Sequence, residues 1–281
     1  MSPADATATL TVLVENCAAQ RGVLGEHGWS VWIDIRGLRI LLDGGQGLAL
    51  RHNAEALGVS VGTADVVVLS HGHYDHADGL WVMRDQLKQA RLYAHRGAFQ
   101  QRYSASTAEG VRPVGSALHD PTEVAQCVSD LIFSDAWTEV ASGVFVTGEI
   151  PRKNDFEDTG DPFFLDETLE RPDPLFDDQA LVLETDRGLA VILGCGHAGV
   201  ANTLDHVAEQ TGERRFHLVL GGMHLRHASP ERIRLTVDAL RRHRVERVGP
   251  AHCTGLVATA EMMRAWGHRF VSIGAGSRVR F

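Results

Sequence analysis

Short runs of valine, isoleucine and leucine alternate with turn residues through the first part of this 281-residue chain. Runs of this length and composition predict β-strands. The stretch after the third run, residues 47–57, predicts a helix that ends at Gly58. Helical spacing resumes over residues 80–87. The strands predicted in this part are residues 10–14, 29–35, 39–42 and 66–69.

The second part of the chain alternates strands and helices in the same style. A pair of strands is predicted first, because two apolar runs flank the turn-forming residues 185–188. One helix is predicted over residues 200–209, and another opens at Ser229 with a proline in its first turn. The strands predicted here are residues 180–184, 189–193, 216–220, 245–248 and 270–273. This alternation predicts two sheets with helices outside them, an α/β layered fold.

The middle of the chain, residues 152–178, has no clear period and is strongly acidic. It contains ten acidic and three basic side chains, together with three prolines. Two interpretations stand side by side. The segment is either a solvated surface loop or a lid, because long loops in compact domains often cover functional sites.

The composition and net charge of the chain indicate which kinds of molecule it can bind. Apolar residues make up 44% and charged residues 22% of the chain, as in ordinary soluble proteins. A formal net charge of -9 disfavours binding to nucleic acid or to an anionic membrane. It still allows a small anionic substrate, because a metal can supply local positive charge. The four cysteines are scattered and we see no signal peptide or membrane span, so we expect a cytoplasmic protein with reduced thiols.

Three imidazoles and a carboxylate fall within six residues directly after the strand predicted at 66–69. Residues two apart in an extended segment point the same way, so His71 and His73 can reach one cation. The chain must turn at Asp75 and His76, whose side chains can serve a second cation. Imidazole and carboxylate ligands suit zinc or a related divalent first-row metal. A surface histidine cluster, the alternative, does not account for four ligand-type residues in six positions.

Later residues must complete the coordination. Two glycine-flanked turns, residues 194–199 and 249–255, each follow a predicted strand and put one histidine at a sheet edge. They supply His197 and His252 as candidate ligands, with Cys195 competing with His197 for its role.

His224 has two interpretations. It follows the strand predicted at 216–220, within the segment Gly221-Gly222-Met223-His224-Leu225. It either donates a hydrogen bond or a proton to a substrate, or is a structural histidine. The residues alone leave both open.

The hexapeptide at residues 71–76 matches the HxHxDH motif, and at these residues the chain resembles the metallo-β-lactamase fold superfamily. Within the superfamily it is similar to the branch of the dihydropterin-methyl-aminobenzene-ribofuranosyl-phosphate synthase and its uncharacterised bacterial relatives. The matching segments span nearly the whole chain. They are residues 14–16, 26–30, 41–45, 69–76, 194–199, 221–225 and 252–255.

The resemblance implies a four-layer αβ/βα sandwich with a dinuclear metal centre at one edge. Residues 1–281 would form one domain, with the acidic loop or lid inserted at about 150–178. Zn²⁺ is the expected cofactor, with Mn²⁺ or Fe²⁺ as alternatives. The expected ligands are His71 and His73 for the first metal, Asp75, His76 and His252 for the second, and His197 in addition. Asp43 and His27 would support the site from behind these ligands.

The chain departs from the wider family at two ligand positions. Glu149 stands where glyoxalase-type enzymes have a histidine, and Cys195 stands where they have a bridging aspartate. His197 is the ligand that we expect, with Glu149 and Cys195 as alternatives. Because fewer or softer ligands would weaken one metal position, a single bound ion is an alternative to two.

The expected activity is metal-dependent hydrolysis of a small ester, a phosphoester or a lactone, by metal-bound hydroxide. Asp75 and His224 are the expected catalytic side chains. One alternative is a transferase that acts on a pterin diphosphate, as the name of the branch implies. Another is a metal-binding scaffold without catalysis. The expected partner is a small molecule, anionic or neutral, rather than nucleic acid or membrane, and the oligomeric state stays open.

Overall fold

The structure is a computed structural model that describes residues 8–106 and 110–281. The strands of its first sheet are β1 (Thr9–Val14), β2 (Ser30–Ile35), β3 (Leu38–Leu42), β4 (Val66–Val68), β5 (Arg91–Ala94), β8 (Asp130–Phe133) and β16 (Arg278–Arg280). They lie in the order β16-β1-β2-β3-β4-β5-β8. The sheet is antiparallel from β16 to β3 and parallel from β3 to β8.

The second sheet repeats this mixture of pairing. Its strands are β9 (Thr138–Ala141), β10 (Val144–Val146), β12 (Leu181–Thr185), β13 (Gly188–Leu193), β14 (Phe216–Gly222) and β15 (Arg247–Ala251). They lie in the order β15-β14-β13-β12-β10-β9. β13, β14 and β15 run parallel, and the remaining pairs are antiparallel. The predicted hairpin across residues 185–188 is the pair β12 and β13.

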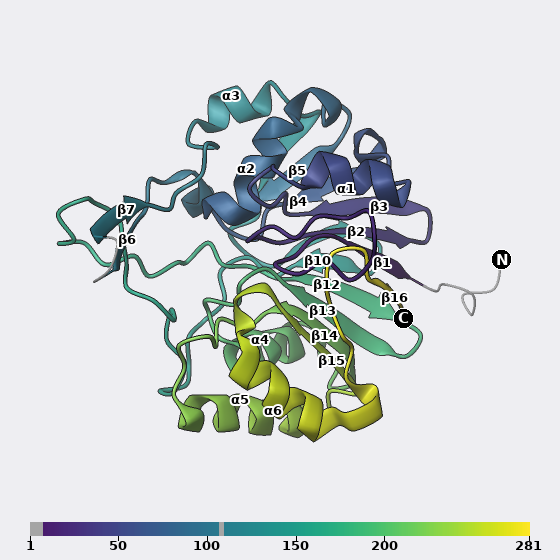
Figure 1. The fold of residues 1–281 in the computed structure, drawn as a ribbon, viewed down its shortest axis with the longest axis vertical. Coiled ribbons are helices and arrows are strands. Elements are labelled where there is room, and N and C mark those ends of the chain that lie inside the picture. The colour runs from purple at the N-terminus through teal and green to yellow at the C-terminus, as the bar shows by residue number, and fades with distance from the viewer. Residues whose placement is uncertain (1–7, 107–109) are drawn as a thin grey trace.

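Helices cover the outer face of each sheet, as Figure 1 shows. α1 (Leu50–Leu57), α2 (Tyr74–Val82) and α3 (Pro121–Ala125) pack on the first sheet. α4 (Val200–Thr211), α5 (Pro230–Arg242) and α6 (Leu256–Trp266) pack on the second. The order helix, sheet, sheet, helix confirms the predicted four-layer sandwich. Short 3-10 turns are η2 (Val61–Thr63), η3 (Arg84–Gln86), η4 (Arg96–Phe99), η5 (His252–Thr254) and η6 (Gly267–Arg269).

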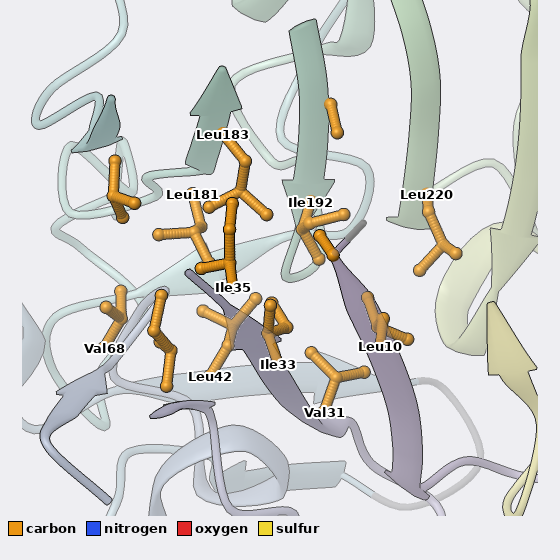
Figure 2. Close-up of a cluster of buried hydrophobic side chains, with 14 of the residues drawn as sticks. Leu10, Val31, Ile33, Ile35, Leu42, Val68, Leu181, Leu183, Ile192 and Leu220 are labelled. Carbon is orange, nitrogen blue, oxygen red and sulfur yellow. The ribbon is translucent and has the colours of Figure 1, made fainter. Parts of the chain in front are cut away.

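The main core lies between the two sheets, where Figure 2 shows side chains of both meeting. β4 explains how one strand serves two cores. Val66 and Val68 point into the layer between the sheets, whereas Val67 points toward the helices. A strand buried on both faces needs a continuous apolar run, which is the pattern that the sequence has there.

The acidic segment, residues 152–178, contributes only the short strand β11 (Phe163–Phe164). This strand pairs with β6 (Tyr103–Ser106), which in turn pairs with β7 (Gly110–Pro113). The small sheet projects from one end of the sandwich (Figure 1). Among the described residues, no helix is both long and apolar enough to cross a membrane.

Two predicted elements were wrong. The helix predicted at 80–87 instead begins at Tyr74 inside the hexapeptide, ends at Val82 and is followed by the 3-10 turn η3. His73, whose backbone is still extended with φ -78° and ψ 145°, is the N-cap, and the helix begins at the next residue. The strand predicted at 270–273 is only an isolated bridge from Phe270 to Val248, and the last strand is β16.

Candidate metal centre

The candidate ligands lie at one edge of the sandwich because each follows the carboxyl end of a strand. The hexapeptide follows β4, His197 follows β13, and His224 and His252 follow β14 and β15. Parallel strands bring these ends together. Asp43, His224 and His252 have φ angles of 59°, 45° and 50°. Such left-handed backbone is costly outside glycine and is concentrated at functional sites.

Three buried histidines form the first cluster of ligand atoms. Ring nitrogens of His71, His73 and His197 lie within 4.8 Å of one another. Nε2 of His71 is 3.0 Å from Nδ1 of His73. Three convergent imidazoles are a common ligand set for zinc.

Asp75, His76 and His252 form the second cluster. Nε2 of His252 lies 3.2 Å from Nε2 of His76 and 3.3 Å from Oδ2 of Asp75. The exposed His27 also reaches this carboxylate, with its Nε2 3.2 Å from Oδ2 of Asp75. Nε2 of His252 therefore lies between the imidazole of His76 and the carboxylate of Asp75, and the ligand atoms of His27, Asp75 and His252 lie within 4.8 Å of one another.

Asp43 supports both clusters from behind. Its Oδ2 lies 2.7 Å from Nδ1 of His76 and accepts a hydrogen bond from Oγ of Ser70 at the same distance. Since the Ser70 proton is directed to Asp43, Oγ of Ser70 accepts from Nδ1 of His71, 2.9 Å away. Both rings thus carry their proton on Nδ1, which leaves the Nε2 lone pair for the centre.

Residues far along the chain orient two further rings. The carbonyl oxygen of Thr159 can only accept, so Nδ1 of His197, 2.9 Å away, donates to it. The amide nitrogen of Asn16 donates to the carbonyl of His252, so its Oδ1 accepts from Nδ1 of that ring at 3.0 Å. Nε2 is again left facing the centre. Acceptors behind the ring are what fix a metal-binding histidine in place.

Burial sets the charge of the first cluster. Burial lowers the pKa of each of the three imidazoles, His71, His73 and His197, well below the ordinary value of a histidine, because desolvation disfavours the charged imidazolium form. Positive charge on neighbouring side chains would lower each pKa further. These histidines therefore stay neutral, which is the form that binds a metal.

In the second cluster, neighbouring side chains shift the pKa values of His76 and Asp75 in the direction opposite to the effect of burial. Burial lowers the pKa of His76, but the carboxylate of Asp43 outweighs it and the net pKa is raised. Burial raises the pKa of Asp75, but the imidazoles of His252 and His27 beside its carboxylate outweigh it and the net pKa is lowered. The carboxylate of Asp75 is therefore ionised at neutral pH, the form in which it can bind a cation.

The donor set fits a divalent cation. Nε2 of His73 and Nε2 of His197 are buried and have no hydrogen-bond partner in the part of the chain that the structure describes. An unsatisfied buried polar atom costs about 1–3 kcal/mol. A cation held by these nitrogens would remove that cost. Nitrogen and carboxylate donors suit zinc and its first-row neighbours better than magnesium or calcium.

The acidic segment forms one wall of this site. The ring of Phe163 lies 4.6 Å from the ring of His73, and Oδ2 of Asp161 lies 3.2 Å from Nε2 of His224. Glu157 anchors the segment by accepting hydrogen bonds from Ala201 and from the residue after it, at the start of α4. The part of the segment between Glu157 and Phe163 therefore lies against the candidate ligands.

A buried ion-pair network ties the same segment to the hexapeptide. The Arg102 side chain, 2% exposed, donates from Nε to Asp173 and from Nη2 to Asp177, each at 2.6 Å. The other carboxylate oxygen of Asp177 accepts the backbone N–H of Gly72 at 2.8 Å. Because Gly72 lies between His71 and His73, this network fixes the backbone that carries them.

The structure keeps Glu149 apart from the other candidates. Its side chain is exposed and belongs to no group of three close ligand atoms among the described residues. Cys195, the other alternative, is buried with its Sγ 3.1 Å from Nε2 of His76.

Sequence reasoning named Asp43 but missed other residues that support the candidate ligands. Ser70 and Asn16 stand inside segments that the sequence singled out, so polar residues beside a ligand motif are a usable signal. Thr159 acts through its backbone carbonyl and leaves no signal in the sequence. Arg102 and Asp177 lie in regions without a recognisable motif.

A cavity of about 180 Å³ opens over the ligands. Two arginines, Arg112 and Arg226, line it together with His224, His227 and the carboxylates of Asp75 and Asp161.

The comparisons with known proteins agree with this geometry. The model of the β-lactamase superfamily domain matches residues 38–133. An uncharacterized protein of Methanocaldococcus jannaschii is 30% identical over 90% of this chain and 93% of its own length. The solved structure of Tm1679, described as a metal-dependent hydrolase of the β-lactamase superfamily, is 33% identical and has a TM-score of 0.83. That match covers 97% of this chain and 98% of the other.

Taken with the four-layer fold, these matches show that the chain belongs to the metallo-β-lactamase superfamily. Within it, the chain is also similar to the 7,8-dihydropterin-6-methyl-4-(β-D-ribofuranosyl)-aminobenzene-5'-phosphate synthase of Methanocaldococcus jannaschii. The two are 27% identical over 91% of this chain and 90% of that protein. The branch resemblance seen in the sequence is therefore confirmed.

Proposed function

We propose that this protein is a metal-dependent hydrolase of small phosphoesters. The observation that carries the proposal is the pair of adjacent ligand clusters at the carboxyl edge of the sheets. We assign His71, His73 and His197 to one metal position and Asp75, His76 and His252 to the other. Zn²⁺ is the cation that we expect there. A cation so bound would lower the pKa of a water to ~7 and polarise the ester.

The cavity supports a phosphoester over a lactone. Arg112 and Arg226 at its lining can pair with phosphate oxygens, which a neutral lactone lacks. This local charge opposes the net charge of -9 of the whole chain and would favour an anion at the site.

His224 is the residue that we propose as proton donor to the leaving group. Its Nε2 is 3.2 Å from Asp161, and its ring lies 4.3 Å from the ring of His197. Burial lowers the pKa of His224, but the hydrogen-bonded carboxylate of Asp161 opposes it and the net pKa is raised, so the ring holds a proton to give. Asp75 would accept a hydrogen bond from the attacking water and so orient it.

The test joins elemental analysis to a panel of phosphomonoesters, phosphodiesters, lactones and thioesters. We expect bound zinc and phosphoester hydrolysis that a chelator abolishes and added zinc restores. H73Q should lose metal and activity together. H206Q is the matched control, since His206 is also buried but contacts the carbonyl of Thr147 outside both clusters. Full hydrolysis by metal-free protein would refute the proposal.

A second candidate function follows from the relative named as a synthase. The same centre could assist the loss of diphosphate from a pterin methyl diphosphate while an aminobenzene ribofuranosyl phosphate takes its place. Incubation with both compounds distinguishes the two. A transferase forms the joined product, whereas a hydrolase forms only the products of water attack. The cytoplasmic location predicted from the sequence stays a prediction.

A further inference from the structure

We infer that Cys195 binds as a thiolate shared by the two metal positions, which makes the centre selective for zinc-like cations. This inference rests on the proposed function only in requiring that metal binds at the two clusters. It adds a sulfur ligand to a site that otherwise consists of nitrogen and oxygen, and it names the chemical class of cation that the site takes.

The position of the sulfur carries the inference. Sγ of Cys195 belongs to three of the five groups of ligand atoms that lie within 4.8 Å of one another. In one it joins His71 and His76, so it reaches a residue of each cluster. In another it joins His197 and His224, and in the third His252 and Cys253. Among the described residues, no other side chain belongs to more than two of these groups. The sulfur therefore lies between the two positions.

The backbone holds this sulfur in place. Glycines flank Cys195, and a Cβ on Gly194 would collide with the Ser70 side chain that supports His71. Gly196 has a φ of 67°, which turns the chain tightly after the cysteine. Cys195 itself is only 3% exposed. A fixed, buried sulfur is preorganised to bind and cannot swing away into solvent.

Cys253 is a matched thiol in a different setting. It is also buried, but its Sγ donates to the carbonyl of Cys195 at 3.4 Å and accepts from the backbone N–H of His224 at 3.3 Å. Backbone groups on two sides satisfy this sulfur. It belongs to one ligand group, without His71 or His76. We therefore assign Cys253 the support of the loop that carries Cys195, and use it as the control.

Binding through Cys195 has a defined proton balance. The S–H bond of the thiol breaks, a bond from sulfur to metal forms, and one proton leaves for the buffer. Thiolate is a soft ligand, so it favours Zn²⁺, Co²⁺ and Cd²⁺ over Mg²⁺ and Mn²⁺, which prefer oxygen.

Cobalt titration of the metal-free protein tests this directly. Thiolate-bound Co²⁺ has a charge-transfer absorption in the near ultraviolet, which nitrogen and oxygen ligands do not give. We expect this band in the wild type and in C253S, and we expect it to be absent in C195S. The wild type should release one more proton per chain than C195S when it binds metal, measured with an indicator in weak buffer.

C195D is the second variant, because a carboxylate can also bridge two cations. It should bind as much metal as the wild type without the charge-transfer band, and its preference should shift from Zn²⁺ toward Mn²⁺. Circular dichroism checks that each variant is folded. If C195S does not fold, C195D decides the question.

Three results would overturn the inference: cobalt bound to the wild type without the band, a band that survives in C195S or C195D, or a band lost in C253S with cobalt still bound. Failure of the proposed function looks different. Protein that shows the band but hydrolyses no ester on the panel keeps the thiolate ligand and loses the hydrolase assignment. Protein that binds no cobalt at either cluster refutes both.

Discussion

Replacing Arg102 with methionine is expected to destabilise the fold and to weaken metal binding at the same time. Arg102 lies between two carboxylates, Asp173 and Asp177, whose side chains are 3% and 0% exposed. Methionine keeps much of the length of the side chain and removes its charge. Both carboxylates would then be buried without a cation.

The magnitude follows from that burial. Removing one partner of a buried ion pair costs about 3–5 kcal/mol of unfolding free energy, because the remaining charge is desolvated and uncompensated. The metal centre should respond too, since Asp177 holds Gly72 between two ligands. Residues that support ligands in this way change metal affinity by about 10–100-fold.

Urea denaturation of the metal-free protein measures the stability, and competition with a chelator measures zinc affinity. R96M is the matched control, because Arg96 pairs with Asp135 at the surface with its side chain 65% exposed. Its loss should stay below about 1 kcal/mol. The triple variant R102M/D173N/D177N should be more stable than R102M, since no unpaired charge remains.

Two outcomes would contradict this reasoning. One is an R102M variant no less stable than R96M, which would mean that the ion pair adds nothing to the fold. The other is R102M with lowered stability and unchanged zinc affinity. That result would separate the network from the ligands and leave Asp177 a purely structural residue.

Three further outcomes are expected. G72A should lose about 1–3 kcal/mol by urea denaturation, because its Cβ would collide with the carbonyl of Ala98; an unchanged midpoint would contradict the close packing. Burial raises the pKa of Asp178 to about 6, so the folded state binds this proton more tightly than the unfolded state, and stability falls as pH rises from about 4 to 6. D178N, still able to accept from Ala198, should then gain up to about 3 kcal/mol at pH 8 and little at pH 4; an equal gain at both would exclude the ionisation. E149Q should keep the metal content of the wild type by elemental analysis, since Glu149 is exposed and apart from both clusters; loss of metal would reinstate Glu149 as a ligand.

The fold could be predicted from the sequence where burial of an element requires a regular pattern of apolar residues. β4 and β13 are buried on both faces, so their apolar runs are continuous and bounded by turns. The start of α2 could not be predicted in this way. Its first turn carries Tyr74, Asp75 and His76, whose polar side chains break the apolar period of a helix. β16 is short and has exposed arginines at both ends, so it lacks the pattern of a buried strand.

The same division explains the site. Candidate ligands that lie close together in the sequence form a recognisable motif, which is why the hexapeptide at residues 71–76 could be identified from the sequence. The groups that orient them are joined only by folding: Asn16 and His252 are 236 residues apart, and Asp177 lies 105 residues from Gly72. Such contacts have no period, and some use only a backbone carbonyl, as at Thr159. A sequence motif can therefore indicate which side chains bind a metal. The direction of each ring, and with it the strength of the site, depends on residues that the motif does not contain.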